Sequence, residues 1–194
     1  MPSMKTLKRR MNSVTTTKKI MKAMNMVAAS KLQKDKAALE AARPFISAAS
    51  DIIRQFRGDP DMAANVFLKP RAVHNTAYVV ITSNRGLCGS YNNDVARLAL
   101  AHMNEGRQEK IFAIGLKGFE FFRRQRKNVV ERLDGVIETA FFEDADRVAR
   151  RCMTMFATGE VDEVYIAYTQ FRSVLVSSPV VERILPRMAS RFLL

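Results

Sequence analysis

The sequence is poor in the residues on which much of the chemistry of small proteins depends. Only two cysteines, Cys88 and Cys152, and two histidines, His74 and His102, occur among 194 residues. Two cysteines cannot form a disulfide framework, and the absence of any CxxC pair or Cys/His cluster argues against a structural zinc site. No stretch approaches the roughly 18 consecutive apolar residues that a transmembrane helix requires. Few histidine-based catalytic arrangements are left.

Glycine is absent from the first 57 residues, and proline occurs there only as Pro2 and Pro44. The intervening residues are rich in Lys, Met, Ala, Leu and Gln, which favour helices. With Ser3 as N-cap, this composition predicts a long helix over 1–57, bent or interrupted at Pro44, where a backbone donor is lost. Such a helix is on the order of 80 Å long, so we expect it to project from the body of the protein.

Acidic residues are absent from the first 34 positions. Residues 1–57 carry 13 Lys and Arg against three acids, a net charge of +10, whereas residues 58–194 carry 19 against 16. This asymmetry indicates an acidic partner, whether nucleic acid, anionic lipid or an acidic protein surface. A mitochondrial transit peptide is also basic and acid-poor, but the helical pattern continues here without a visible cleavage site.

A stripe of apolar residues with heptad-like spacing runs along the predicted helix: Met4, Leu7, Met11, Val14, Met21 and Ala28. Lys18 interrupts it. The spacing is typical of a helix that pairs with one other helix, although an ordinary core helix is an alternative. From Ile20 to Ala29 apolar side chains occupy almost every face, so this block requires burial all round by other helices or chains.

The remainder of the chain alternates between strand and helix patterns after a linker over 58–75. We expect strands at 77–82, 110–114, 128–133 and 164–171, helices at 92–104, 117–125 and 143–157, and a last extended segment at 174–185 broken by Pro179. This alternation predicts an α/β domain over 76–194, with right-handed crossovers and a mainly parallel sheet.

The loop Gly86–Gly89 lies between a strand and a helix, where phosphate-binding loops occur. It lacks both GxGxxG and GK[ST], so we expect no nucleotide site there. Cys88 has no recognised Cys/His signature around it. We therefore expect no catalytic residue, no cofactor and no metal.

Five motifs together resemble the gamma subunit of F-type ATP synthases. They are long, ordered and correctly spaced over almost the whole chain. The motifs are LKRRMNSVTTTKKIMKAMNMVAASKL (7–32), ARPF (42–45), ITSNRGLCGSYN (81–92), DEVYIAYTQFRS (162–173) and ILP (184–186).

This resemblance implies that the long helix is half of an antiparallel coiled coil, attached to a Rossmann-like domain that binds no nucleotide. It implies a central-stalk rotor that couples transmembrane ion flow to ATP synthesis or hydrolysis, without a catalytic site of its own. The implied partners are the alpha and beta subunits, the epsilon subunit and the c-subunit ring, with no nucleic acid and with membrane contact only through the complex. Because the sequence starts directly at the family motif, we expect the cytoplasmic face of a bacterial plasma membrane rather than the mitochondrial inner membrane.

The resemblance also implies subunit-facing residues within the matched motifs: Lys18, Lys19, Ile20, Lys22, Met24, Val27, Lys31, Arg85, Leu87 and Cys88. The family's second long helix does not follow residues 184–186, which suggests a fragment or a shortened relative. We expect the unpaired stripe to make the chain self-associate.

Two other functions remain alternatives at this point. The first is a nucleic-acid-binding protein with a basic helical arm. Against it, no aromatic residue precedes Phe45, and the apolar block at Ile20–Ala29 stays exposed on a duplex. The second is a small nucleotide-dependent enzyme that uses the Gly86–Gly89 loop.

Overall fold

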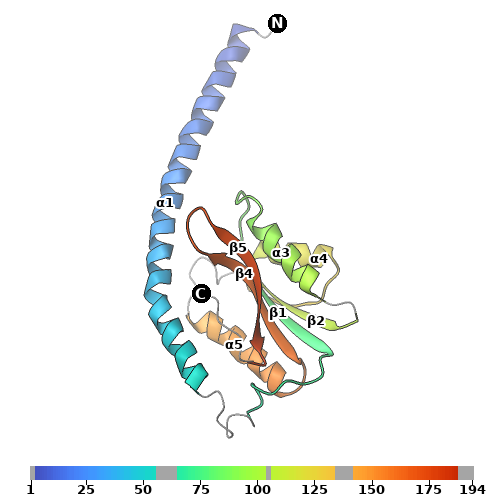
Figure 1. Cartoon of the computed structure of the whole chain (residues 1–194). Coiled ribbons are helices and arrows are strands. Elements are labelled where there is room, and N and C mark those ends of the chain that lie inside the picture. Colours follow the sequence, from blue (N-terminus) through green and yellow to red (C-terminus); the bar gives the residue numbers. More distant parts are fainter. Residues whose placement is uncertain (1–2, 56–64, 104–105, 134–141, 188–194) are drawn as a thin grey trace. The chain divides into compact units, whose positions relative to one another are not determined.

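The computed structural model describes residues 3–55, 65–103, 106–133 and 142–187. The chain divides into two compact units, Met1–Phe56 and Arg57–Leu194 (Figure 1). The first unit is a single helix, and the second is an α/β domain, so the predicted fold class is confirmed.

The first unit consists of α1, Met4–Gln55, a helix of 52 residues. Its first turn is capped by Ser3, whose carbonyl accepts the N–H groups of Thr6 and Leu7 at 2.9 and 3.1 Å. Pro44 lies inside α1, and the helix continues through it. The interruption expected there is therefore wrong, because the good helix formers on both sides outweigh one missing donor. A local bend at Pro44 stays a prediction.

The apolar stripe of α1 is exposed. Met4, Met11, Val14 and Met21 retain 83, 66, 67 and 65% of their accessible surface. The alternative of an ordinary core helix of this chain is therefore wrong. Exposed apolar surface of this extent marks a candidate interaction surface.

The second unit is built on a five-stranded sheet in the order β3-β2-β1-β4-β5 (Figure 1). Pairs β1–β2, β1–β4 and β2–β3 are parallel, and β4–β5 is antiparallel. The predicted, mainly parallel sheet is confirmed. The elements are β1 Asn75–Ile81, α3 Tyr91–His102, β2 Gln108–Ile114, α4 Leu116–Arg124, β3 Val129–Leu133, α5 Phe142–Ala157, β4 Glu163–Phe171 and β5 Ser177–Leu185.

The expected break at Pro179 is wrong. Pro179 lies inside β5, where it is paired in register with Thr169 of β4. Since β5 is an edge strand, alternate N–H groups of this strand have no partner strand, and a residue without an N–H is tolerated. The extended segment also starts later than expected, at Ser177, because residues 172–176 form the turn between β4 and β5.

The core lies on both faces of the sheet, because a parallel sheet is covered by helices on both sides. Successive side chains of β1 point to opposite faces of the sheet. Ala77 and Val79 belong to the hydrophobic cluster on one face, and Tyr78 and Val80 belong to the cluster on the other. The first cluster includes Phe112 and Phe156, which are fully buried, and the second includes Val95 and Phe122 of α3 and α4. This packing fixes the loops at the carboxyl ends of the parallel strands.

A buried carboxylate lies at the amino-terminal ends of β1 and β4. Asp162 accepts the backbone N–H groups of His74 and Asn75, both at 2.9 Å, and pairs with Arg71 Nε at 2.8 Å. Arg71 also lies over the ring of Phe156, 4.3 Å from its centroid. The segment that precedes β1 is thereby tied to the start of β4.

We expect this site to make stability depend on acid pH. Burial by itself raises the pKa of Asp162, but the N–H groups of Asn75 and His74 and the Arg71 guanidinium outweigh it and hold that pKa below its usual value. The stabilisation is therefore complete above the unfolded pKa of about 3.9 and is lost as pH falls through the lower native value.

Asp162→Asn removes this dependence. The free energy of unfolding of the variant should decline less steeply than that of the parent chain between about pH 4 and pH 2. Urea unfolding at several pH values measures both slopes. Equal slopes would contradict the assignment.

Candidate functional site

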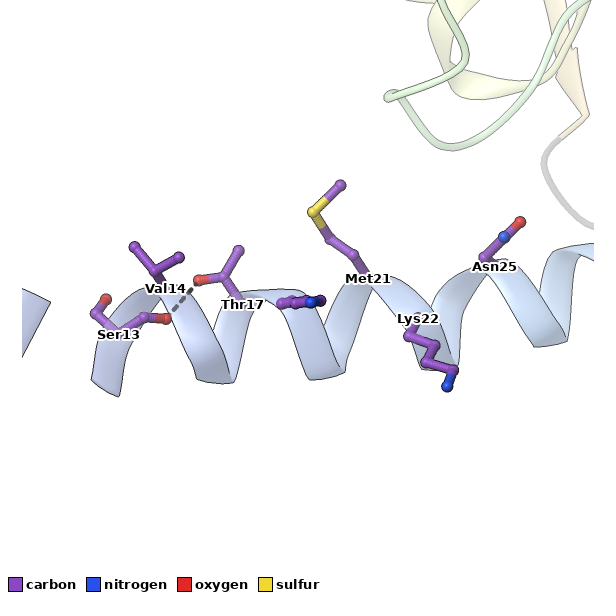
Figure 2. A pocket seen from close by; sticks show the side chains of 7 residues that line it. Ser13, Val14, Thr17, Met21, Lys22 and Asn25 are labelled. Atoms are coloured by element: carbon purple, nitrogen blue, oxygen red, sulfur yellow. Dashed lines mark hydrogen bonds between the residues drawn. The ribbon is translucent and has the colours of Figure 1, made fainter. Parts of the chain in front are cut away.

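Side chains of α1 line a groove along this helix. It is lined by Ser13, Val14, Thr17, Lys18, Met21, Lys22 and Asn25 (Figure 2). In Figure 2 the side chains of Val14, Met21 and Asn25 project from the same side of the helix. We call Val14, Lys18, Met21, Asn25 and Ala28 the seam, because they follow one another at intervals of three or four residues.

A second stripe with the same spacing lies on another face of α1 and consists of Ile20, Met24, Val27 and Lys31. Ile20, Met24 and Val27 retain 55, 57 and 57% of their surface. Lys19 belongs to neither stripe, and Lys22 borders the seam. The seven predicted interface residues of α1 thus lie on more than one face, as expected for a helix that several neighbours surround.

A buried threonine at the end of β1 anchors the loop that follows this strand. Thr82 Oγ1 donates to the carbonyl of Ile114 at 3.1 Å and accepts the N–H of Gly118 at 2.8 Å. A Cβ on Gly118 would lie 2.8 Å from Thr82 Oγ1, so only glycine allows α4 to approach this closely. The start of α4 is therefore held against the end of β1.

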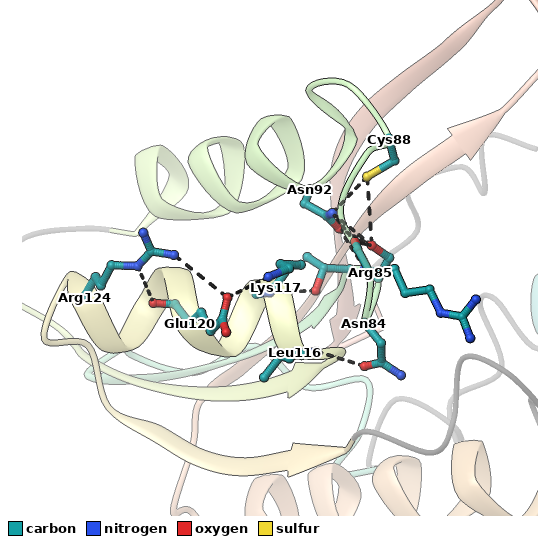
Figure 3. A network of polar contacts seen from close by, with 11 residues as sticks. Asn84, Arg85, Cys88, Asn92, Leu116, Lys117, Glu120 and Arg124 are labelled. Atoms are coloured by element: carbon teal, nitrogen blue, oxygen red, sulfur yellow. Dashed lines mark hydrogen bonds and ion pairs between the residues drawn. The ribbon is translucent and has the colours of Figure 1, made fainter. Parts of the chain in front are cut away.

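Asn92, in the first turn of α3, holds the loop above this anchor (Figure 3). Its Oδ1 accepts the backbone N–H of Ser83 at 2.8 Å, and its Nδ2 lies 3.1 Å from Cys88 Sγ and 3.3 Å from the carbonyl of Arg85. Asn84 Oδ1 accepts the N–H of Leu116 at 3.0 Å. These amides give the loop a fixed shape.

The fixed loop presents an apolar side chain to its surroundings. Leu87 is fully exposed and has φ +61°. The turn after β4 presents two more, because Val174 and Leu175 retain 69 and 95% of their surface. Since β1 and β4 are parallel neighbours, the loop and this turn lie at the same edge of the sheet. Arg85 and Cys88 of the predicted site are exposed on this loop.

Asn84, Asn92 and the apolar turn at Val174 and Leu175 are not among the residues predicted from the sequence. An amide in a strand-to-helix loop or at the start of a helix is a signal for the first two, because such side chains pair with loop backbone. The apolar turn has no such signal, because three apolar residues in a row, Val174–Val176, favour a strand.

No residue pair suited to nucleophilic catalysis is assembled in the described residues. His74 precedes β1, at the opposite end of that strand from Cys88, and His102 Nδ1 lies 3.0 Å from the hydroxyl of Tyr78. Burial raises the pKa of the Cys152 thiol to about 11, so this thiol is protonated at neutral pH. Within the described ranges, no group of three or more metal-ligating side chains is present, and no helix is long and apolar enough to cross a membrane.

Comparison with known proteins agrees with this arrangement. A family model described as ATP synthase matches residues 3–192. The ATP synthase gamma chain of Moorella thermoacetica is 37% identical over 96% of this chain and 66% of its own length, and that of Rhizobium johnstonii is 37% identical over 97% and 67%. A chain from the central stalk and c-ring of the Tetrahymena thermophila mitochondrial ATP synthase superposes with a TM-score of 0.69 at 27% identity, over 86% of this chain and 72% of its own.

This chain spans about two thirds of the length of the curated relatives that it matches. The match extends from the exposed helix through the loop after β1 to the last strand. The chain therefore belongs to the ATP synthase gamma-chain family.

Proposed function

We propose that this chain is a central-stalk rotor subunit of a rotary ATP synthase, which couples ion flow to ATP synthesis or hydrolysis. The observation that carries the proposal is α1: a 52-residue helix whose apolar side chains and lysines are exposed on several faces. Such a surface suits a shaft enclosed by other subunits. The membership of the chain in the gamma-chain family supports the same role.

The proposal divides the chain into a shaft at 1–57, a linker at 58–75 and an α/β base at 76–194. The seam takes a partner helix, and the second stripe with Lys19 faces the alpha and beta subunits. The cations favour acidic collar surfaces on those subunits, since complementary charge guides and orients association.

The loop with Arg85, Leu87 and Cys88 is assigned to a further subunit contact. Its shape is fixed before binding, so little conformational entropy is lost on association. The base contacts the epsilon subunit and the c-subunit ring. Through that ring the protein lies at the cytoplasmic face of a bacterial plasma membrane, and the bacterial relatives support this placement.

Co-expression with bacterial alpha and beta subunits tests the proposal. We expect an affinity-tagged chain to retain both subunits through gel filtration in moderate salt. In parallel, binding to a random DNA duplex should be weak and disappear with salt. Retention of DNA without retention of alpha and beta would support the nucleic-acid alternative instead.

A further inference from the structure

Lys18 occupies an apolar position of the seam. It lines the groove together with Val14 and Met21. Lys18 follows Val14 by four residues and precedes Met21 by three. Its neighbour Lys19 lies outside this groove. When a partner helix covers the seam, the Lys18 ammonium is therefore the charge that becomes enclosed between the helices.

An enclosed ammonium requires a counter-charge, because an unpaired charge removed from water is strongly destabilising. Helix α1 cannot supply one. The nearest acidic residue in sequence is Asp35, which lies about 25 Å further along the helix at 1.5 Å per residue. The helix that covers the seam is the neighbour best placed to supply the carboxylate.

The flanks of the seam carry the same charge. Lys8, Arg10 and Lys22 occupy heptad positions beside the apolar stripe from Met4 to Ala28, of which the seam is the later part, and no acid occurs within the first 34 residues. A second copy of α1 in the same stretch brings only cations to these positions, and like charges across a coiled coil disfavour pairing. Charge complementarity thus favours an acidic helix over a second copy of this chain, so the self-association expected of the uncovered stripe should give way when such a helix is present.

We propose that Lys18 determines which helix occupies the seam and in which register: the partner is an amphipathic helix with a carboxylate facing Lys18 and acids along its flanks. A polar residue at an apolar heptad position fixes register at some cost in affinity. This role is assigned to Lys18, because Asn25, the other polar residue of the seam, carries no charge. This inference rests on the proposed function, since it specifies the partner helix of the shaft.

Fluorescence anisotropy with the full 194-residue chain tests the proposal. The probes are three labelled synthetic helices with the same leucine seam and glutamates on the flanks. They differ only at the position that faces Lys18 in antiparallel pairing, which is Glu, Gln or Lys. We expect the Glu helix to bind about tenfold more tightly than the Gln helix, and the Lys helix to bind most weakly. Salt should narrow these differences.

Two variants of the chain separate the seam from general charge. Lys18→Glu should reverse the order, so that the Lys helix binds best. Lys19→Glu makes the same change of charge one residue away and should keep the original order. Circular dichroism verifies that both variants retain the helix content of the parent chain.

The remaining outcomes are distinct. Equal binding of the three helices overturns the role of Lys18 but leaves the shaft function intact. Binding of none of them also overturns the proposal, because then the seam takes no acidic helix, whereas the shaft function is still decided by retention of the alpha and beta subunits. A dimer of the chain that excludes all three helices identifies a second copy as the occupant and also overturns the proposal.

Discussion

Replacing Val14 and Met21 together by aspartate is expected to prevent a partner helix from covering the seam, and the incomplete shaft should then no longer be retained by the alpha and beta subunits. Both side chains belong to the seam and retain about two thirds of their surface, 67 and 65%, in the free chain. Burying a side chain of this size contributes about 1.5–3 kcal/mol, and each new carboxylate is unpaired among apolar groups. We expect association to weaken by more than about 100-fold. Co-purification from the co-expression strain measures the loss.

A matched control is available on the same stretch of α1. Asn12→Asp combined with Thr16→Asp adds the same two charges to exposed positions on a different face from the seam. This control should retain most of the association of the parent chain. If both double variants lose the subunits equally, net charge rather than the seam governs binding.

Phe156→Ala is expected to remove a large part of the free energy of unfolding of the α/β domain, while α1 remains helical. Phe156 is fully buried in the last turn of α5, stacks with Phe67 at 6.1 Å between ring centroids, and lies under the Arg71 guanidinium. Truncation of a buried phenylalanine costs about 3–5 kcal/mol, a large share of the stability of a domain. Thermal or urea unfolding should show a lower midpoint in proportion.

The tyrosines allow this domain to be followed separately. All four, Tyr78, Tyr91, Tyr165 and Tyr168, lie in the second unit, so the near-ultraviolet signal of tyrosine reports on it, whereas α1 contributes only the phenylalanine signal of Phe45. Met153→Ala, at a 43%-exposed position of the same helix, is the control and should change the midpoint little. A midpoint for Phe156→Ala equal to that of the control would contradict the described core.

The long helix was predictable because its signal is the absence of breakers over a long span. The exception at Pro44 shows that one missing hydrogen bond does not end a helix with strong helix formers on both sides. The strands were predictable as short β-rich runs between helices. Pro179 was misread because a local pattern does not reveal that β5 is an edge strand, which depends on the pairing of the whole sheet.

The candidate site was only partly predictable. The spacing of Val14, Lys18 and Met21 places them on one face of any helix, so the seam follows from the sequence. The loop after β1 does not, because its shape depends on Asn92 and on the close approach of Gly118 to Thr82, which are tertiary contacts. Its proximity to the turn at Leu175 depends on the order of the strands.

Native mass spectrometry of the complex purified through the alpha and beta subunits tests the rotor proposal most directly. The account predicts one copy of this 21.9 kDa chain for each ring of three alpha and three beta subunits. Val14→Asp combined with Met21→Asp should remove that single copy from the spectrum. Rings without the chain, or with three copies of it, would contradict a central shaft.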